Sequence, residues 1–528
     1  MREKPWHSRT PDIHYTPGFR HACIHPNPMK VIRRRTLFHQ RRSSNLYRIF
    51  GLLILIFGGV WFTWQLDTGI IHNPFEPTPT ATRTINSMVQ EGEAQFQAGN
   101  LDLAIAAYQQ ATSQGGNGDP AVWTELARIQ SYSSSLLSND ADRLARLTDA
   151  LQSANQAVAV GPDDSDAFAI RAFVEDWNAD PALDPLRTGT KKAADYLFDA
   201  QKDAVQSLSL DSQNPLGLAY YAEILIDQQK WDQAALYITP AIQLGPQVMD
   251  VHRVYGYYLE STANYSEAIV EYQKALAIDP NLTFLYLSIG NNYRTLAFNS
   301  TLPSQQSDLY NSARANYAKA ITIDNQLKTL DPSINDPSPY IAIAKTYAQQ
   351  GQFFAAALNA QEAISIDPTN ADLYGQLGDI YKRGRNFETS IIALRCAVEG
   401  CDALASCQAV LAGSDCIGVE VKPLVLNPNS AVYYLDLGSV LSAFAPNKPE
   451  YCPEVVTLLS QIVNAYPDNT IITRNSAVGL QICAEVTAGL TQTPGVTVSP
   501  GATLILTATP TAPFMPTPTP GPVYTPLP

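Results

Sequence analysis

Residues 255–280, YGYYLESTANYSEAIVEYQKALAIDP, set the pattern for most of this chain. Large side chains recur in this stretch at helical spacing, while Gly256, Ala268 and Ala275 are small where two helices would cross. Pro280 ends the second helix, because proline cannot continue it. Similar residues stand thirty-four positions earlier, at Tyr221, Ala222, Leu225, Ala234, Ile238, Ala241 and Pro246. A fixed period of this length predicts a solenoid of stacked helix pairs.

The same pattern returns on both sides of this stretch. It recurs upstream at Gly92, Ala104, Tyr108 and Ala111, and downstream at Ile343, Ala344, Tyr347, Ala356, Ala360, Ala363 and Pro368. The sequence resembles the tetratricopeptide repeat family over roughly three quarters of its length. The resemblance implies an all-α solenoid of antiparallel helix pairs, and we expect eight units over about 85–400.

Three units are longer than the period. In the units opened by Trp123 and Tyr286, eleven residues are inserted before the second helix resumes at Ala150 and Ala313. Eleven residues are close to three helical turns, so longer helices accommodate them without turning the buried face away. The stretch Ser138-Asn139-Asp140 is expected to supply the N-cap of one of these lengthened helices.

Composition divides the chain into six segments. They are a basic segment at 1–48, a transmembrane anchor at 49–66, a Thr/Pro linker at 67–84, the solenoid at 85–400, a degenerate cysteine-containing cap at 401–490, and a disordered Thr/Pro-rich tail at 491–528. In the cap we expect one helix near 452–465 and a last helix near 471–488.

Residues 49–66, IFGLLILIFGGVWFTWQL, form the one segment of membrane length. Eighteen helical residues reach about 27 Å, close to the hydrocarbon thickness. Basic residues precede the segment, so the positive-inside rule predicts a cytoplasmic N-terminus and an exoplasmic solenoid in a single-pass cell-membrane protein. A small-residue cleavage site does not follow, which favours an uncleaved signal-anchor over a signal peptide or a buried helix. Translation from Met29 would place a short basic N-terminus directly before the anchor.

Charge is distributed unevenly. The chain carries a formal net charge of −14, yet its first forty-eight residues hold eleven Lys and Arg against two Asp and Glu. Everything after them is therefore strongly acidic. An acidic solenoid argues against nucleic acid as its ligand.

Cysteines gather on the predicted exoplasmic side. Six of the seven lie in the irregular C-terminal quarter: Cys396, Cys401, Cys407, Cys416, Cys452 and Cys483. An even number in an oxidising compartment predicts disulfides, and Cys452 with Cys483 is the first pairing we expect. The other four allow three connectivities, and reduced buried cysteines are the alternative. Their spacing is not that of a zinc site, and we expect no metal.

Catalytic chemistry finds little support in the residues. Six of seven histidines precede the repeats, and only His252 lies within them, at a helix-packing position. One histidine does not supply a Ser-His or Cys-His arrangement, and no Gly-rich phosphate loop or HExxH motif occurs. We therefore expect no enzyme activity, no cofactor and no small-molecule substrate.

The resemblance also implies a binding face. In tetratricopeptide repeat proteins, first-helix residues on the inner curve line a groove for an extended peptide or a partner helix. Here these positions are Glu223, Arg253, Tyr257, Asn291, Arg294, Lys345, Asp379 and Lys382. Arg253, Asn291 and Arg294 are suited to holding a carboxylate or an amide of a bound peptide. Ordinary solvated helix residues are the alternative.

These features predict a membrane-anchored bacterial scaffold or adaptor that binds protein or peptide ligands at the cell envelope. Two alternatives stay open. One is a structural spacer that links the membrane to the cell wall or to a surface polymer. The other is an accessory subunit of an envelope secretion or glycan-assembly complex.

Overall fold

The computed structural model describes residues 45–68, 84–330, 334, 336–411 and 416–491. The expectations for the segment before residue 45, for a start at Met29, for most of the linker and for the tail after residue 491 lie outside the described residues. By its contacts the chain separates into two units, Met1–Thr82 and Arg83–Pro528.

The first unit contains helix α1, Leu46–Asp67. Within the described residues, α1 is the one helix long and apolar enough to cross a membrane. Its Leu46–Gln65 window has a mean hydropathy of 1.8, and its apolar side chains are exposed. Length and composition agree with the predicted anchor, whose insertion in a membrane stays a prediction.

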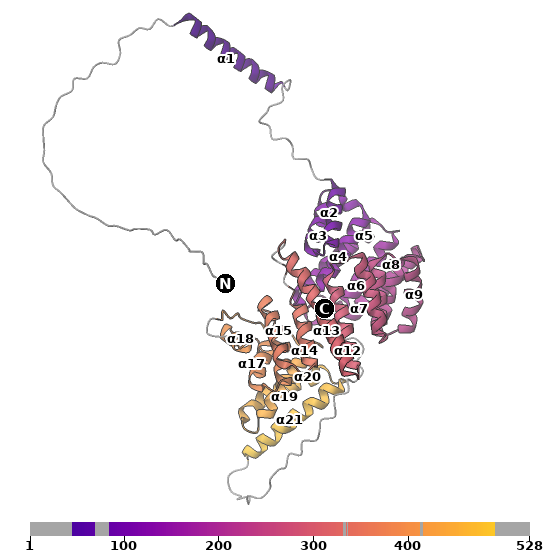
Figure 1. Ribbon diagram of the computed structural model, residues 1–528, viewed down its shortest axis with the longest axis vertical. Helices are drawn as coiled ribbons and strands as arrows, with labels where there is room; N and C mark the ends of the chain where they lie inside the picture. Colours follow the sequence, from indigo (N-terminus) through magenta and orange to yellow (C-terminus); the bar gives the residue numbers. More distant parts are fainter. Residues whose placement is uncertain (1–44, 69–83, 331–333, 335, 412–415, 492–528) are drawn as a thin grey trace, which may run out of the picture. The chain divides into compact units, whose positions relative to one another are not determined.

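The second unit is an array of helices, drawn from purple to yellow in Figure 1. Its helices are α2 (Ile85–Gln97), α3 (Leu101–Ser113), α4 (Pro120–Ser134), α5 (Asp140–Val160), α6 (Ser165–Asn178), α7 (Ala193–Leu210), α8 (Pro215–Asp227), α9 (Trp231–Leu244), α10 (Met249–Ser261), α11 (Tyr265–Ile278), α12 (Thr283–Asn299), α13 (Pro303–Leu327), α14 (Ser338–Gln349), α15 (Phe353–Ile366), α16 (Ala371–Arg383), α17 (Phe387–Val398), α18 (Ala403–Ala409), α19 (Ala431–Phe444), α20 (Cys452–Ala465) and α21 (Thr470–Thr491).

Small residues let the two helices of a pair approach. A Cβ atom at Gly256 of α10 would lie 2.8 Å from the ring of Tyr272 in α11, so glycine is needed for this close packing. Gly290 and Tyr317 make the same arrangement in α12 and α13. Pairs of this kind follow one another from α2/α3 to α16/α17, and the predicted all-α solenoid is confirmed.

Lengthened helices absorb two of the insertions. Helix α5 has 21 residues and α13 has 25. The side chain of Asn139 caps α5 by accepting a hydrogen bond from the backbone N–H of Asp142, as the sequence predicts. The third lengthened unit has its extra residues between Ala172 and Ala200, and these contain a short 3₁₀ helix, Pro181–Leu186.

The array winds back on itself. Asn281 Nδ2, between α11 and α12, donates to the carbonyl of Gln97 at the end of α2, 2.9 Å away. Gly99 stands beside this contact with φ of +84°, a conformation that favours glycine. Further along, Asn370 Nδ2 donates to the carbonyl of Ser138 at 2.8 Å. Helix pairs far apart in sequence therefore touch.

Candidate functional site

Aromatic side chains fill the interior of the first turn of this coil. Tyr132 of α4 stacks on Phe284 of α12 with ring centroids 5.1 Å apart, and Phe173 of α6 stacks on Tyr220 of α8 at 4.6 Å. Trp177 meets Tyr132 edge-on at 5.6 Å. These rings come from first helices of the pairs and meet where an open solenoid would have a groove. In this half of the array the concave face is a core.

Two of the residues predicted to line a groove belong to that core. Arg253 is fully buried and forms a bidentate pair with Glu223, at 2.7 and 2.6 Å. Arg253 Nε also donates to the hydroxyl of Tyr132 at 3.0 Å. The placement of Arg253 and Glu223 on an open binding face was wrong, because the tight winding encloses their positions.

A second buried carboxylate lies beside this pair. Asp250 accepts hydrogen bonds from Arg128 at 3.1 Å, from Tyr220 at 2.7 Å and from Tyr132. Burial alone would raise the pKa of Asp250, but Arg128, Arg253 and the two tyrosine hydroxyls outweigh it and lower the pKa. The first half thus holds a buried network of ionised groups.

The side chains of Tyr257 and His252 also contact neighbouring residues of the helix array. The Tyr257 hydroxyl donates to Asp227 at 2.6 Å and is partly buried. The buried His252 ring contacts Glu271 at 2.8 Å and the carbonyl of Pro246 at 3.1 Å. The hydrogen bond with Glu271 raises the pKa of His252 despite its burial. Neither side chain lines the cavity described next.

An open cavity of about 1010 Å³ lies in the second half of the array. The first helices α12, α14, α16 and α19 form one wall, and the loop before α5 forms another. Residues 416–430, which we call the strap, close the remaining side with Glu420, Lys422 and Asn427. Five of the eight predicted groove residues line this cavity: Asn291, Arg294, Lys345, Asp379 and Lys382.

Four carboxylates in the cavity are engaged by side chains of the protein, whereas Glu420 on the strap has no such partner within the described residues. Asp379 pairs with Lys382 at 3.4 Å, and Lys382 also pairs with Asp436. Asp372 accepts from the hydroxyl of Tyr433 at 2.7 Å, and Asp140 pairs with Arg143 at 2.8 Å. Burial raises the pKa of Asp436 to about 6, although Lys382 opposes this.

Three cations that line the cavity lack such side-chain partners. Arg294, Lys345 and Lys422 have no hydrogen bond or ion pair within the described part of the chain. Lys345 is exposed to the cavity, yet the protein around it removes solvation and Arg294 repels it, so both lower its pKa. Asn291 accepts from the hydroxyl of Tyr317 at 2.9 Å. The cavity therefore contains charged groups of both signs, and Asp372 and Asp379 partly offset the lowering of the Lys345 pKa.

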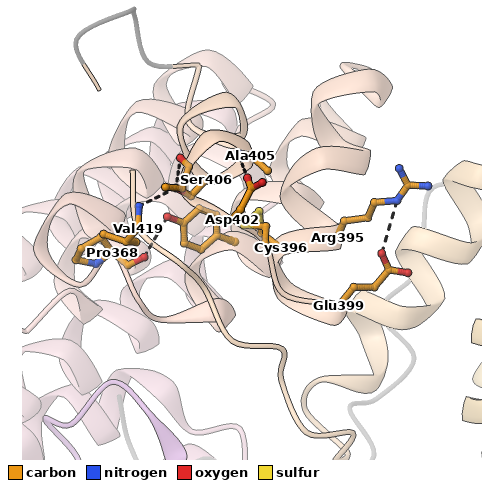
Figure 2. Close-up of a disulfide and its surroundings, with 11 residues drawn as sticks. Pro368, Arg395, Cys396, Glu399, Asp402, Ala405, Ser406 and Val419 are labelled. Atoms are coloured by element: carbon orange, nitrogen blue, oxygen red, sulfur yellow. Dashed lines mark hydrogen bonds and ion pairs between the residues drawn. A yellow bond between two sulfur atoms is a disulfide. The ribbon is translucent and has the colours of Figure 1, made fainter. Parts of the chain in front are cut away.

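Contacts with the array hold the strap in place. Cys401 and Val421 exchange two backbone hydrogen bonds, at 2.9 and 2.8 Å, and Leu424 N–H donates to the carbonyl of Ala397 at 2.9 Å. Val419 N–H donates to the hydroxyl of Ser406 at 3.1 Å, a contact visible in Figure 2. At the other end, Asn427 Nδ2 donates to Asp140 at 3.2 Å.

The structure joins all six cysteines of the cap in pairs. Cys396 pairs with Cys401 (Figure 2), Cys407 pairs with Cys416 at the start of the strap, and Cys452 pairs with Cys483 between α20 and α21. The Cα atoms of these pairs are 4.7, 5.9 and 5.2 Å apart. Their oxidation in the cell stays a prediction. Within the described residues, no three His, Cys, Asp or Glu side chains are placed to hold a metal ion.

Sequence reasoning missed the strap and the loop before α5 as cavity walls. Both lie outside the 34-residue pattern, which identifies inward-facing helix residues only. Their contacts, such as Asn427 with Asp140, join residues 287 positions apart. No local sequence signal reports such a contact.

Comparisons with known proteins gave one family match and several similar solved structures. Residues 222–282 match the family model described as tetratricopeptide repeat. No curated protein matches the chain. Among solved structures, the human IFIT1 dimer with PPP-AAAA is 14% identical, with a TM-score of 0.46, over 77% of this chain and 92% of that one.

A second similar structure is TTC0263, a thermophilic TPR protein of Thermus thermophilus. It is 16% identical, with a TM-score of 0.31, over 40% of this chain and 98% of that one. The repeat pattern, the helix pairs and the match at 222–282 all point to one family. Residues 222–282 therefore carry tetratricopeptide repeats, a scaffold for protein–protein interactions, and the helix pairs on either side have the same architecture.

Proposed function

We propose that this protein is a membrane-anchored adaptor that holds a segment of a partner protein in the cavity between the strap and helices α12, α14 and α16. The single observation that supports this best is that five predicted groove residues line an open cavity. The interior of the first turn is filled by side chains such as Tyr132 and Phe284. Ligand binding is thereby assigned to the second half of the array.

The cavity suits a short extended segment of protein. Its volume of about 1010 Å³ is at the upper end of the roughly 300–1,000 Å³ of small-molecule clefts. Its walls come from three separate parts of the chain and carry both charged and apolar side chains, such as Lys345, Ile341 and Val432. Such a lining contacts alternate side chains of an extended peptide.

The membrane context is part of the proposal. Helix α1 has the length and composition of a span, and the basic residues that precede it favour a cytoplasmic N-terminus. The repeats would then be exoplasmic, where the paired cysteines are oxidised. Alkaline extraction tests the anchor, and we expect the protein to stay with the membrane. Protease added to intact cells should digest the repeats, and their protection would reverse the orientation.

Site-specific photo-crosslinking tests the binding site. A photoreactive residue at Val432, which lines the cavity and is 47% exposed, should capture one defined protein from native membranes carrying the full chain. A photoreactive residue at Leu236, exposed on α9 away from the cavity, is the matched control. The same adduct should form at Val432 in independently prepared membranes. Equal capture at both positions, or none at Val432, would contradict the proposal.

A further inference from the structure

The backbone of the strap is paired along one edge only. The N–H and C=O groups of Val421 both bond to Cys401, at 2.8 and 2.9 Å, and form an isolated antiparallel bridge. In an extended chain the backbone groups of successive residues point to opposite edges. The N–H and C=O groups of Glu420 and Lys422 therefore point away from Cys401. Within the described part of the chain, none of these four groups forms a hydrogen bond.

Two opposite charges accompany this unpaired edge. Val421 is buried, whereas Glu420 and Lys422 are exposed and line the cavity. Among the residues that the structure describes, neither side chain has an ion-pair or hydrogen-bond partner. The edge thus presents an acidic and a basic side chain two positions apart, on the face opposite to Val421.

The strap is held in place before any ligand arrives. Leu424 N–H donates to the carbonyl of Ala397 at 2.9 Å, which ends the unpaired edge after Lys422. Gly400 has a φ of +77°, and a Cβ atom there would lie 2.7 Å from the carbonyl oxygen of Val421. Glycine therefore allows the strap to approach closely. An edge that is already ordered loses little conformational entropy when a further strand adds to it.

We propose that an extended segment of the partner protein adds to the strap as an antiparallel β-strand. Its backbone exchanges two hydrogen bonds with Glu420 and two with Lys422, as Cys401 does with Val421 on the other edge. An acidic side chain of the segment lies opposite Lys422, and a basic side chain two positions later lies opposite Glu420. This inference rests on the proposed function, since it names how the adaptor recognises the segment.

The backbone and the charges both favour a strand as the ligand. Unpaired N–H and C=O groups on an edge are matched by another extended backbone, whereas a helix already pairs its own groups internally. The sequence of the strap also fits itself, because Glu420 and Lys422 are an acidic and a basic residue in the required order. A second copy of the chain is therefore the competing occupant. The place of the strap in the wall of a cavity of about 1010 Å³ favours a single segment.

Fluorescence anisotropy with the full chain in detergent tests the strand. The probes are a labelled threonine–glutamate–valine–arginine–threonine peptide and two N-methylated forms. Methylation at glutamate removes an N–H that faces the strap, and methylation at valine removes one that faces away. We expect the first to lower affinity at least about tenfold and the second less than about threefold. Equal losses, or no saturable binding of the unmodified peptide, would overturn the inference.

Substitutions at Lys422 separate the backbone from the side chain. Lys422→Pro removes an N–H of the unpaired edge, and a following proline is compatible with the extended conformation of Val421. It should lower affinity at least about tenfold, whereas the matched control Lys422→Ala keeps the N–H and should lose only about threefold. Equal losses, with the Val421 amide still protected from hydrogen exchange, would contradict strand addition. If that protection is lost in Lys422→Pro, the N-methylated peptides on the natural chain decide.

A charge exchange tests the order of the two side chains. Glu420→Lys combined with Lys422→Glu should reverse the preference, so that a peptide with arginine before glutamate binds more tightly than the original. An unchanged preference would refute the charge pattern. Sedimentation velocity tests the second copy, and we expect one mass at all concentrations. A dimer that Lys422→Pro dissociates would replace the partner segment with another copy of the chain.

The crosslinking experiment separates the two proposals. If Val432 captures a defined protein while the two N-methylated peptides bind equally, the adaptor function stands and strand addition is wrong. If the N-methylated peptides differ as expected but Val432 captures nothing in membranes, the strap accepts a strand and the adaptor function fails. Loss of both results removes both proposals.

Discussion

Arg253 is a large, fully buried, charged side chain of the first turn, and its environment predicts a strong effect on stability. The guanidinium is fully buried and pairs with Glu223 at 2.6 and 2.7 Å. Arg253→Ala would leave a buried carboxylate without its partner, so we expect a loss of about 3–5 kcal/mol in the free energy of unfolding. Chemical denaturation monitored by circular dichroism measures this change.

Arg294→Ala serves as the matched control for Arg253→Ala. Arg294 lies at a similar position on a first helix but is half-buried and unpaired within the described residues. Its removal should change stability by less than about 1 kcal/mol. Equal effects of the two substitutions would contradict the assignment of Arg253 to the core.

Asp324 and Asp336 lie where α13 leads to α14. We expect them to make the folding stability depend on pH. Each has one carboxylate oxygen that is buried without a hydrogen-bond partner. Burial, together with the charge of Asp336, raises the pKa of Asp324 to about 8, and burial raises the pKa of Asp336 to about 6. The folded state therefore favours the protonated form, and the stability from Asp324 falls as pH rises from about 4 to about 8.

Asp324→Asn should remove the part of this pH dependence that comes from Asp324, because the amide does not ionise. We expect the variant to gain stability over the natural chain as pH rises from about 5 to about 8, by at most about 1.4 kcal/mol per pH unit. Thermal unfolding at the two pH values measures the gain. Asp308→Asn, exposed on the same helix, is the control and should show no such trend. A gain that is equal at both pH values would contradict this account.

At the scale of helices, the sequence predicted what short-range patterns determine. Helix α20, Cys452–Ala465, lies where a helix near 452–465 was expected, and α11 ends at Ile278, just before Pro280. Gly256 and Gly290 mark the crossings with Tyr272 and Tyr317. These features depend on contacts within one helix pair, so the 34-residue period predicts them.

The link between α20 and α21 gives a prediction at this scale. Cys452 and Cys483 are 31 residues apart and buried, and a disulfide that closes such a loop stabilises by about 3–4 kcal/mol in the chain-entropy model. Cys452→Ser with Cys483→Ser should speed hydrogen exchange in α21 while α12 stays protected. Non-reducing peptide mapping comes first, and free thiols at both positions would contradict the disulfide.

At the scale of the whole molecule, contacts across the coil predict long-range coupling. Phe284 of α12 stacks on Tyr132 of α4, so Phe284→Ala should cost about 3–5 kcal/mol and weaken both helices. In an open solenoid each unit contacts only its neighbours, and α4 would be unaffected. Hydrogen exchange should therefore become faster in α4 as well as in α12.

Phe354→Ala is the control for this experiment, because Phe354 is 80% exposed on α15. It should leave exchange in α4 unchanged. If Phe284→Ala also leaves α4 unchanged, the two ends of the turn are not energetically coupled.

The winding of the coil is the part that the sequence did not predict. The period identifies Arg253 and Arg294 as inward-facing residues of first helices, yet Arg253 is buried and Arg294 lines a cavity. The difference arises from contacts such as Tyr132 with Asp250, which are 118 residues apart. Local spacing does not determine the radius of the superhelix. It therefore did not distinguish inward-facing residues that are buried in the core from those that line the cavity.

The contact of Asn281 with Gln97 also bears on how such a chain can change over evolution. Repeat arrays commonly lengthen or shorten by duplication or deletion of whole units. Between α4 and α12 this route is closed, since one added helix pair would part Tyr132 from Phe284 and Asn281 from Gln97. Further along, Asn370 contacts Ser138 and Asn427 contacts Asp140, so the same limit holds for the units up to the strap. Relatives of this protein should therefore keep a constant number of units from α4 to the strap and differ in length outside this stretch.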